Sequence, residues 1–154
     1  SGMYIHVNKW QHYAVTYDGT KVTIYVNGQK AGDKNITSKV VKDGYFKYLT
    51  FGGIGGNNGA WAPGDRWWYG CNIMVTECRI WSVARTADQI SKNILNVVPD
   101  TQGLEGYWKV SKATYDEVTK EFADLTGKGH PMTTNKSFVW NENISTEDTS
   151  SPWK

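Results

Sequence analysis

The chain has 154 residues, which is enough for one domain around a single core and too short for two. Its 17 Lys and Arg oppose 15 Asp and Glu, and this net charge of +2 argues against nucleic acid or an anionic membrane as a partner. There is no run of about 18 apolar residues, so no membrane insertion is expected. Eight Trp and nine Tyr suit both half-buried sheet faces and surfaces that stack on sugars.

The first forty residues predict a β-hairpin. Residues 10–17 are rich in aromatic and β-branched side chains and stop at Asp18-Gly19, and residues 21–26 alternate cleanly and stop at Asn27-Gly28. Asp-Gly and Asn-Gly supply the positive φ angles that tight hairpin turns require. A third strand is expected to start at Gln29.

The rest of the chain predicts short strands and one helix. Thr86 and Gln89 have the spacing of a capping box, and Ile90 and Ile94 give a one-sided apolar contact, so a helix is expected near 87–95. Strands are expected at residues 45–51, 72–81, 104–110, 121–125 and 138–140. These elements indicate an all-β fold, an antiparallel β-sandwich of the jelly-roll kind, over residues 1–140, followed by a polar tail at 141–154.

The two cysteines, Cys71 and Cys78, lie seven residues apart in one strand-like run. In an extended chain their separation is roughly 23 Å, which is beyond the reach of a disulfide. Because seven is odd, the two side chains point to opposite faces. We expect two free thiols, with that of Cys78 pointing inward.

Six segments occur in the order of a known family. They are residues 10–19 (Trp-Gln-His-Tyr-Ala-Val-Thr-Tyr-Asp-Gly), 22–28, 51–53, 77–86, 103–108 and 124–130. Together they resemble the concanavalin A-like lectin/glucanase (laminin-G-like) superfamily, in the form found in bacterial surface proteins. The resemblance implies two antiparallel sheets packed face to face, ligand loops along a concave sheet or one rim, and a secreted or cell-surface location.

The sequence departs from that family at its beginning. In relatives the Trp-x-His hairpin usually follows several strands that have no counterpart here, which raises the hypothesis that N-terminal strands of a longer domain are missing. An exposed strand edge would then favour a partner chain or self-association.

Glycoside hydrolysis requires two carboxylates that flank the scissile bond. The candidate strand offers Glu77 alone, with Val75, Arg79 and Trp81 as its neighbours on the same face. Glu77 and Arg79 are interpreted as a structural ion pair, and Glu117, Glu121 and Asp124 as solvated turn charges. The chain is therefore expected not to be an enzyme.

Candidate metal ligands are sparse. The three histidines show no zinc-binding spacing, and His12 is interpreted as a packed residue inside a strand. No cofactor is expected, although loop carboxylates at Asp33, Asp43 and Asp65 could hold a calcium ion with backbone carbonyls.

The loop of residues 55–69 carries the functional prediction. Sugars present C–H faces to aromatic rings and hydroxyls to polar groups, and this loop interleaves both kinds of side chain. The candidate carbohydrate ligands are Asn57, Asn58, Trp61, Asp65, Arg66, Trp67, Trp68 and Tyr69. The competing interpretation is that these aromatics only cover one end of the sandwich.

The sequence thus predicts a non-catalytic carbohydrate-binding, lectin-like module that binds a glycan or another surface protein. Two alternatives stay open. One is an adhesion or interaction domain that binds protein and no glycan, and the other is a fragment of a glycoside hydrolase whose acids lie outside this chain.

Overall fold

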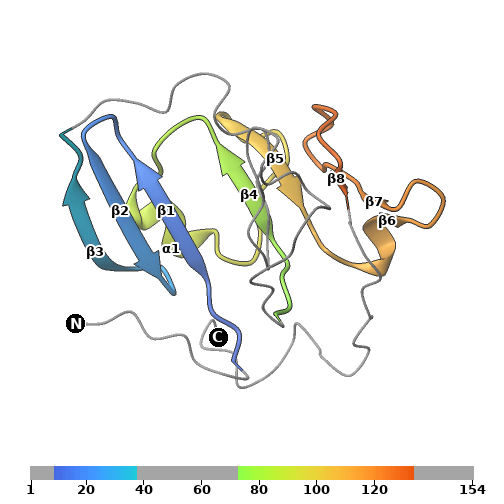
Figure 1. Cartoon of the computed structure of the whole chain (residues 1–154), viewed down its shortest axis with the longest axis horizontal. Helices are drawn as coiled ribbons and strands as arrows, with labels where there is room; N and C mark the ends of the chain where they lie inside the picture. Colours follow the sequence, from blue (N-terminus) through green and yellow to red (C-terminus); the bar gives the residue numbers. More distant parts are fainter. Residues whose placement is uncertain (1–8, 38–72, 134–154) are drawn as a thin grey trace, which may run out of the picture.

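The structure is a computed structural model that describes residues 9–37 and 73–133. Those residues form antiparallel sheets with one short α-helix, which confirms the predicted all-β class (Figure 1). The elements are β1 (Tyr13–Tyr17), β2 (Lys21–Val26), β3 (Gln29–Asn35), β4 (Cys78–Trp81), α1 (Ala87–Lys92), β5 (Leu104–Trp108), the 3-10 helix η1 (Lys112–Thr114), β6 (Tyr115–Asp116), β7 (Glu121–Phe122) and β8 (Met132–Thr133).

The predicted hairpin and third strand are confirmed as the sheet β1-β2-β3. β1 pairs antiparallel with β2 from Tyr13 opposite Val26 to Tyr17 opposite Val22. β2 then pairs with β3 from Lys21 opposite Asn35, with one irregularity between Ile24 and Tyr25. The first strand begins three residues later than the run at 10–17 predicted.

The two turns of this sheet have very different surroundings. Gly19 in the β1–β2 turn has φ +96°, and a Cβ added there would meet no atom within 4 Å. Gly28 in the β2–β3 turn has φ +77°, and a Cβ there would lie 2.9 Å from the Cα of Ser91 in α1. Glycine at position 28 is therefore required both by the backbone angle and by the close approach of the helix.

The strand predicted at 72–81 is shorter in the structure and begins at Cys78. Glu77 adopts φ +55°, a left-handed conformation that interrupts an extended chain. From Cys78 onward, β4 pairs antiparallel with β5, with Cys78 opposite Trp108 and Ile80 opposite Gly106. β5 likewise ends at Trp108, earlier than the predicted strand at 104–110.

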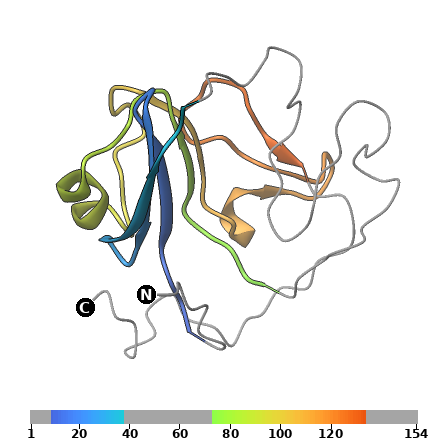
Figure 2. The same ribbon diagram turned by 60° about the vertical axis from the view of Figure 1, so that its left-hand side comes forward.

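The capping box that the sequence predicted is present at the start of α1. The Gln89 amide donates to the Thr86 hydroxyl, and the Thr86 amide donates to the Gln89 side chain. The helix ends at Lys92, before the predicted limit at 95, and buries Ile90, which is 7% exposed. Figure 2 shows α1 on one side of the β1-β2-β3 sheet.

The last part of the described chain forms the small sheet β6-β7-β8. The strand predicted at 121–125 is confirmed only over Glu121–Phe122. The strands predicted at 45–51 and 138–140, and the tail at 141–154, lie outside the described residues.

The core of the described residues is centred on β5. The buried apolar side chains are Tyr25, Cys78, Ile90, Leu104, Tyr107, Trp108 and Phe122, with Leu104 and Tyr107 each 1% exposed. Cys78 points inward as predicted, and burial raises the pKa of its thiol to about 11. At pH 8 its thiolate fraction is therefore on the order of one in a thousand.

This burial predicts that Cys78 resists thiol reagents. In a Cys71→Ser variant, which leaves Cys78 as the sole cysteine, an aromatic disulfide reagent at pH 8 should release almost no chromophore from the native protein. One thiol per chain should react once guanidinium unfolds it. Rapid stoichiometric reaction of the native variant would contradict the buried position of this side chain.

Candidate functional site

All eight residues predicted to contact a glycan lie outside the described residues, within 55–69. Asp43 and Asp65, two of the three predicted calcium ligands, also lie outside the described residues. The third, Asp33, is described, and its carboxylate lies 3.0 Å from Lys30 Nζ and 3.5 Å from Lys21 Nζ. The described residues contain two other candidate sites, a polar network and a groove.

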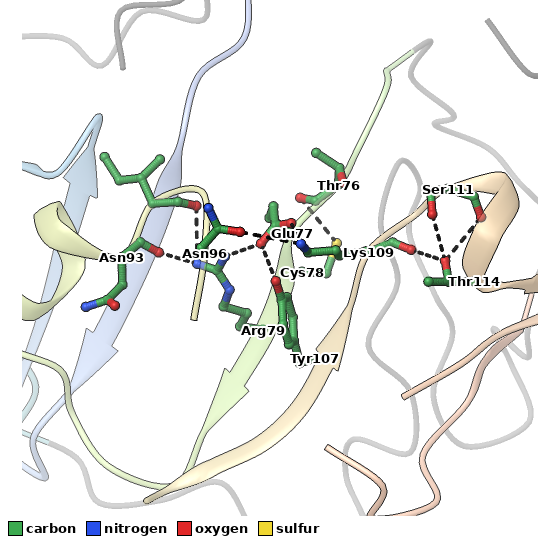
Figure 3. A network of polar contacts seen from close by, with 11 residues as sticks. Thr76, Glu77, Cys78, Arg79, Asn93, Asn96, Tyr107, Lys109, Ser111 and Thr114 are labelled. Carbon is green, nitrogen blue, oxygen red and sulfur yellow. Dashed lines mark hydrogen bonds and ion pairs between the residues drawn. The ribbon is translucent and has the colours of Figure 1, made fainter. Parts of the chain in front are cut away.

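The first cluster is a polar network where β4 meets β5 (Figure 3). The Glu77 carboxylate accepts a hydrogen bond from the Arg79 guanidinium and one of 2.7 Å from the Tyr107 hydroxyl. The Arg79 and Glu77 side chains are only 7% and 14% exposed. The ion pair that the sequence predicted is therefore confirmed, and it lies in a largely buried environment.

Arg79 also reaches beyond its own strand. Its Nη1 donates to the carbonyls of Asn93 and Ile94, the latter at 3.2 Å, just after α1 ends. Its guanidinium carbon lies 5.0 Å from the centre of the Tyr107 ring, within the range of a cation–π contact. One side chain thus joins β4, β5 and the segment that follows the helix.

Burial and the charges of this network shift the pKa values of Tyr107 and His12. Burial, together with the hydrogen bond to Glu77, raises the pKa of Tyr107 to about 12. Burial and the Arg79 charge lower the pKa of His12, which keeps this imidazole neutral at pH 7. Tyr107 cannot act as a general base near neutral pH, and the Glu77 carboxylate is already occupied by three partners, including Lys109 Nζ at 3.6 Å. The network is a structural element.

The second cluster is an open groove on β4 and β5. It has a volume of about 320 Å³ and is lined by Ile80, Glu105, Gly106, Trp108 and His130. Ile80 is 38% exposed, whereas Trp108 is 6% exposed and forms part of the floor. The groove thus combines an apolar base with two polar residues, Glu105 and His130, in its lining.

Gly106 determines how the floor is built. A Cβ at this position would overlap the Trp108 ring, so the indole can lie against the strand only because residue 106 is glycine. The indole Nε1 donates a 2.7 Å hydrogen bond to the His130 carbonyl. The ring is therefore held in one orientation by the strand on one side and by the segment before β8 on the other.

Glu105 is held at the margin by two donors. Its carboxylate accepts 2.8 Å hydrogen bonds from Ser82 Oγ and from Lys128 Nζ. Hydrogen bonds from Lys128 and Ser82 lower the pKa of Glu105, so the group carries a negative charge at neutral pH. A fixed anionic acceptor at the edge of an apolar floor is suited to binding hydroxyl or amide donors of a ligand.

Asp124 organises the turn that carries His130 to the groove. One carboxylate oxygen accepts from Thr126 Oγ1 (2.7 Å), from the Thr126 amide (3.0 Å) and from the Tyr107 amide (3.2 Å). The other accepts from the His130 amide at 3.3 Å. Asp124 is thus a turn charge, as the sequence indicated, but it is partly buried and accepts four hydrogen bonds. The Asp-x-Thr-Gly pattern, typical of a side chain that caps its own turn, was the available signal.

The residues that line the groove include no pair of carboxylates that could carry out hydrolysis. Glu105 is the sole carboxylate among the five residues that line it. Within residues 9–37 and 73–133, no group of three or more His, Cys, Asp or Glu side chains is placed to hold a metal ion. None of the helices in these ranges is long and apolar enough to cross a membrane.

Comparison with known families agrees with this architecture. Residues 1–91 match the family described as the concanavalin A-like lectin/glucanases superfamily, which is more than half of the chain. The chain belongs to this superfamily. The resemblance inferred from its six sequence segments is confirmed. No curated protein sequence matches the chain.

Two solved structures resemble this superfamily member. One, described as a "putative carbohydrate binding protein from Bacteroides ovatus", shares 28% identity at a TM-score of 0.65. The match covers 86% of this chain and 40% of that one, so the chain spans well under half of its relative. The other is an S-layer domain-containing protein from Clostridium thermocellum, with 26% identity, a TM-score of 0.48, and coverage of 60% of this chain and 42% of that one.

The Arg79 network predicts a large loss of stability on truncation. Arg79→Met should lower the free energy of unfolding in urea by about 3 kcal/mol or more, because Glu77 loses its main partner in a poorly solvated position.

The matched control is Lys92→Met, which breaks the Lys92–Asp88 pair on α1, whose side chains are 72% and 78% exposed. Exposed pairs contribute roughly 1 kcal/mol or less, so this variant should unfold close to wild type. Equal losses in the two variants would show that Arg79 has no special structural role.

Proposed function

We propose that this chain is a non-catalytic carbohydrate-binding module of a secreted or cell-surface protein. The main support is the match over 86% of the chain to a structure described as carbohydrate-binding. Membership of a superfamily of lectins and glucanases supports the same ligand class. The location is proposed from the resemblance to domains of bacterial surface proteins.

Two regions are proposed to contact the glycan. The first is the aromatic and polar segment at 55–69, in which Trp67 and Trp68 would offer ring faces to sugar C–H groups. The second is the groove on β4 and β5, where Glu105 would accept hydrogen bonds from sugar hydroxyls above the floor formed by Ile80 and Trp108. The proposed module needs no cofactor, and Asp33, Asp43 and Asp65 are the carboxylates to test for calcium binding.

Binding without hydrolysis is favoured by the chemistry of the groove. Retaining glycosidases need two carboxylates about 5 Å apart, and Glu105 is already engaged by Lys128 and Ser82. The second candidate function, an interaction domain that binds protein, is favoured by the exposed apolar side chains of β1, Tyr13, Val15 and Tyr17. An exposed strand edge in the same sheet would serve such a partner or self-association.

A glycan array decides between these functions. Wild type should bind at least one glycan class, and Trp67→Ala or Trp68→Ala should weaken that binding about 10-fold or more, the loss of about 1.4 kcal/mol that a central aromatic contact carries. Glu105→Gln should weaken binding similarly if the groove takes part. The matched control is Glu117→Gln, because Glu117 is an exposed acid paired with Lys120.

Further arms of the same experiment test the remaining proposals. Bound glycan should stay intact, with no new reducing ends after long incubation, and a chelator should abolish binding only if calcium is needed. Absence of binding to every glycan by a folded wild-type protein would overturn the carbohydrate proposal. Binding that survives both tryptophan substitutions would remove the 55–69 segment from the site.

A further inference from the structure

The pairing of β4 with β5 is irregular beside the groove. Ile80 lies opposite Gly106. The next pair joins Trp81 to Leu104, which leaves Glu105 as an extra residue on β5. One extra residue on one strand of an antiparallel pair is the arrangement of a β-bulge.

The bulge accounts for the direction of the Glu105 side chain. In a regular strand Glu105 would share a face with Tyr107 and point away from Gly106 and Trp108. Glu105 nevertheless lines the groove together with Gly106 and Trp108. Bulges are over-represented beside functional sites, where they re-aim a side chain. The irregularity thus adds a carboxylate to a groove face that regular alternation would leave apolar.

This edge of the groove keeps hydrogen-bonding capacity for a ligand. An ionised carboxylate offers about four acceptor sites, and within the described chain Ser82 and Lys128 each use one. The Lys128 ammonium has three donors, of which one goes to Glu105 and one to the Leu104 carbonyl at 2.7 Å. The Lys128 and Glu105 side chains are 43% and 42% exposed, so a ligand can reach the remaining donor and acceptors.

The charges of Lys128 and Glu105 balance each other. Lys128 Nζ lies 2.8 Å from Glu105 Oε2, so a donor and an acceptor stand side by side. Adjacent hydroxyl oxygens of a sugar ring are separated by about the same length as a hydrogen bond. One hydroxyl can therefore donate to the carboxylate while its neighbour accepts from the ammonium. A neutral ligand leaves the ion pair intact, whereas a ligand carboxylate would compete with Glu105 for Lys128.

We propose that the groove binds a neutral sugar through two adjacent hydroxyls, which are held between Glu105 and Lys128. This inference rests on the proposed carbohydrate-binding function and names the class of sugar and a specificity residue, Lys128. The groove volume of about 320 Å³ is at the lower end of the range of small-ligand pockets, about 300–1,000 Å³. It suits a terminal sugar and not a long stretch of polysaccharide.

An NMR titration of the full chain with the methyl glycosides of glucose, galactose and mannose tests this proposal. At least one of these neutral sugars should shift the indole N–H signal of Trp108, which lies at the floor of the groove and donates to the His130 carbonyl. A deoxy derivative that lacks one of the two adjacent hydroxyls should bind about 10-fold more weakly, the loss expected for a hydrogen bond to a charged group.

Lys128→Met tests the role of the ammonium. This variant should bind the parent sugar and one of its deoxy derivatives equally, because the hydroxyl that met Lys128 no longer has a donor. A substitution that only loosened the turn would weaken both ligands and keep the difference between them. Lys128→Arg retains the charge and the donors, so it should retain the preference for the parent sugar.

Lys120→Met is the matched control for the loss of a positive charge. Lys120 belongs to the exposed pair with Glu117 in the connection between β6 and β7, so this variant should bind both ligands like wild type. Circular dichroism checks that every variant is folded.

The outcomes separate this inference from the proposed function. If the protein binds glycans on the array but no sugar moves the Trp108 signal, the groove inference is overturned and the proposed function stands. The same holds if wild type binds the parent sugar and every deoxy derivative equally, or if glucuronic acid binds more tightly than glucose. Absence of binding to every glycan by the folded protein overturns both.

Discussion

The arrangement of the described chain depends on the contacts of one guanidinium. Arg79 holds Glu77 before β4, lies against Tyr107 of β5 and donates to the carbonyls that follow α1. Because these groups are largely removed from water, each polar partner is needed by the others. The helix end, the start of β4 and the middle of β5 are thereby fixed together. Ile80 follows Arg79 in β4, so its side chain points to the opposite face of the strand, where it lines the groove.

The residues that line the groove lie partly inside and partly outside the region that matches the family. The matched region ends at residue 91 and includes Ile80, whereas Glu105, Trp108 and His130 follow it. Asp124 links these later residues, because its carboxylate accepts from the amides of both Tyr107 and His130. The matched region therefore supplies one wall of the groove, and the turn organised by Asp124 supplies its margin.

Local signals in the sequence predicted the local structure well. The Asp-Gly and Asn-Gly turns, the capping box of Thr86 and Gln89 and the inward side chain of Cys78 all depend on neighbours in the chain, and the structure confirms them. The left-handed conformation of Glu77 was not predictable, because it is stabilised by Arg79 and Tyr107 and not by its own type. The groove was missed for the same reason, since it joins residues 50 positions apart along the chain. The segment at 55–69, on which the functional prediction rests, lies outside the described residues.

The two turns at the ends of β2 give this sheet one adaptable end and one fixed end. Gly28 lies against Ser91 with no room for a side chain, so a longer connection there would push the helix off the sheet. Gly19 faces open space at the opposite end of the same strand. Insertions, whether natural or engineered, should therefore be tolerated between Asp18 and Thr20 and not at the β2–β3 turn.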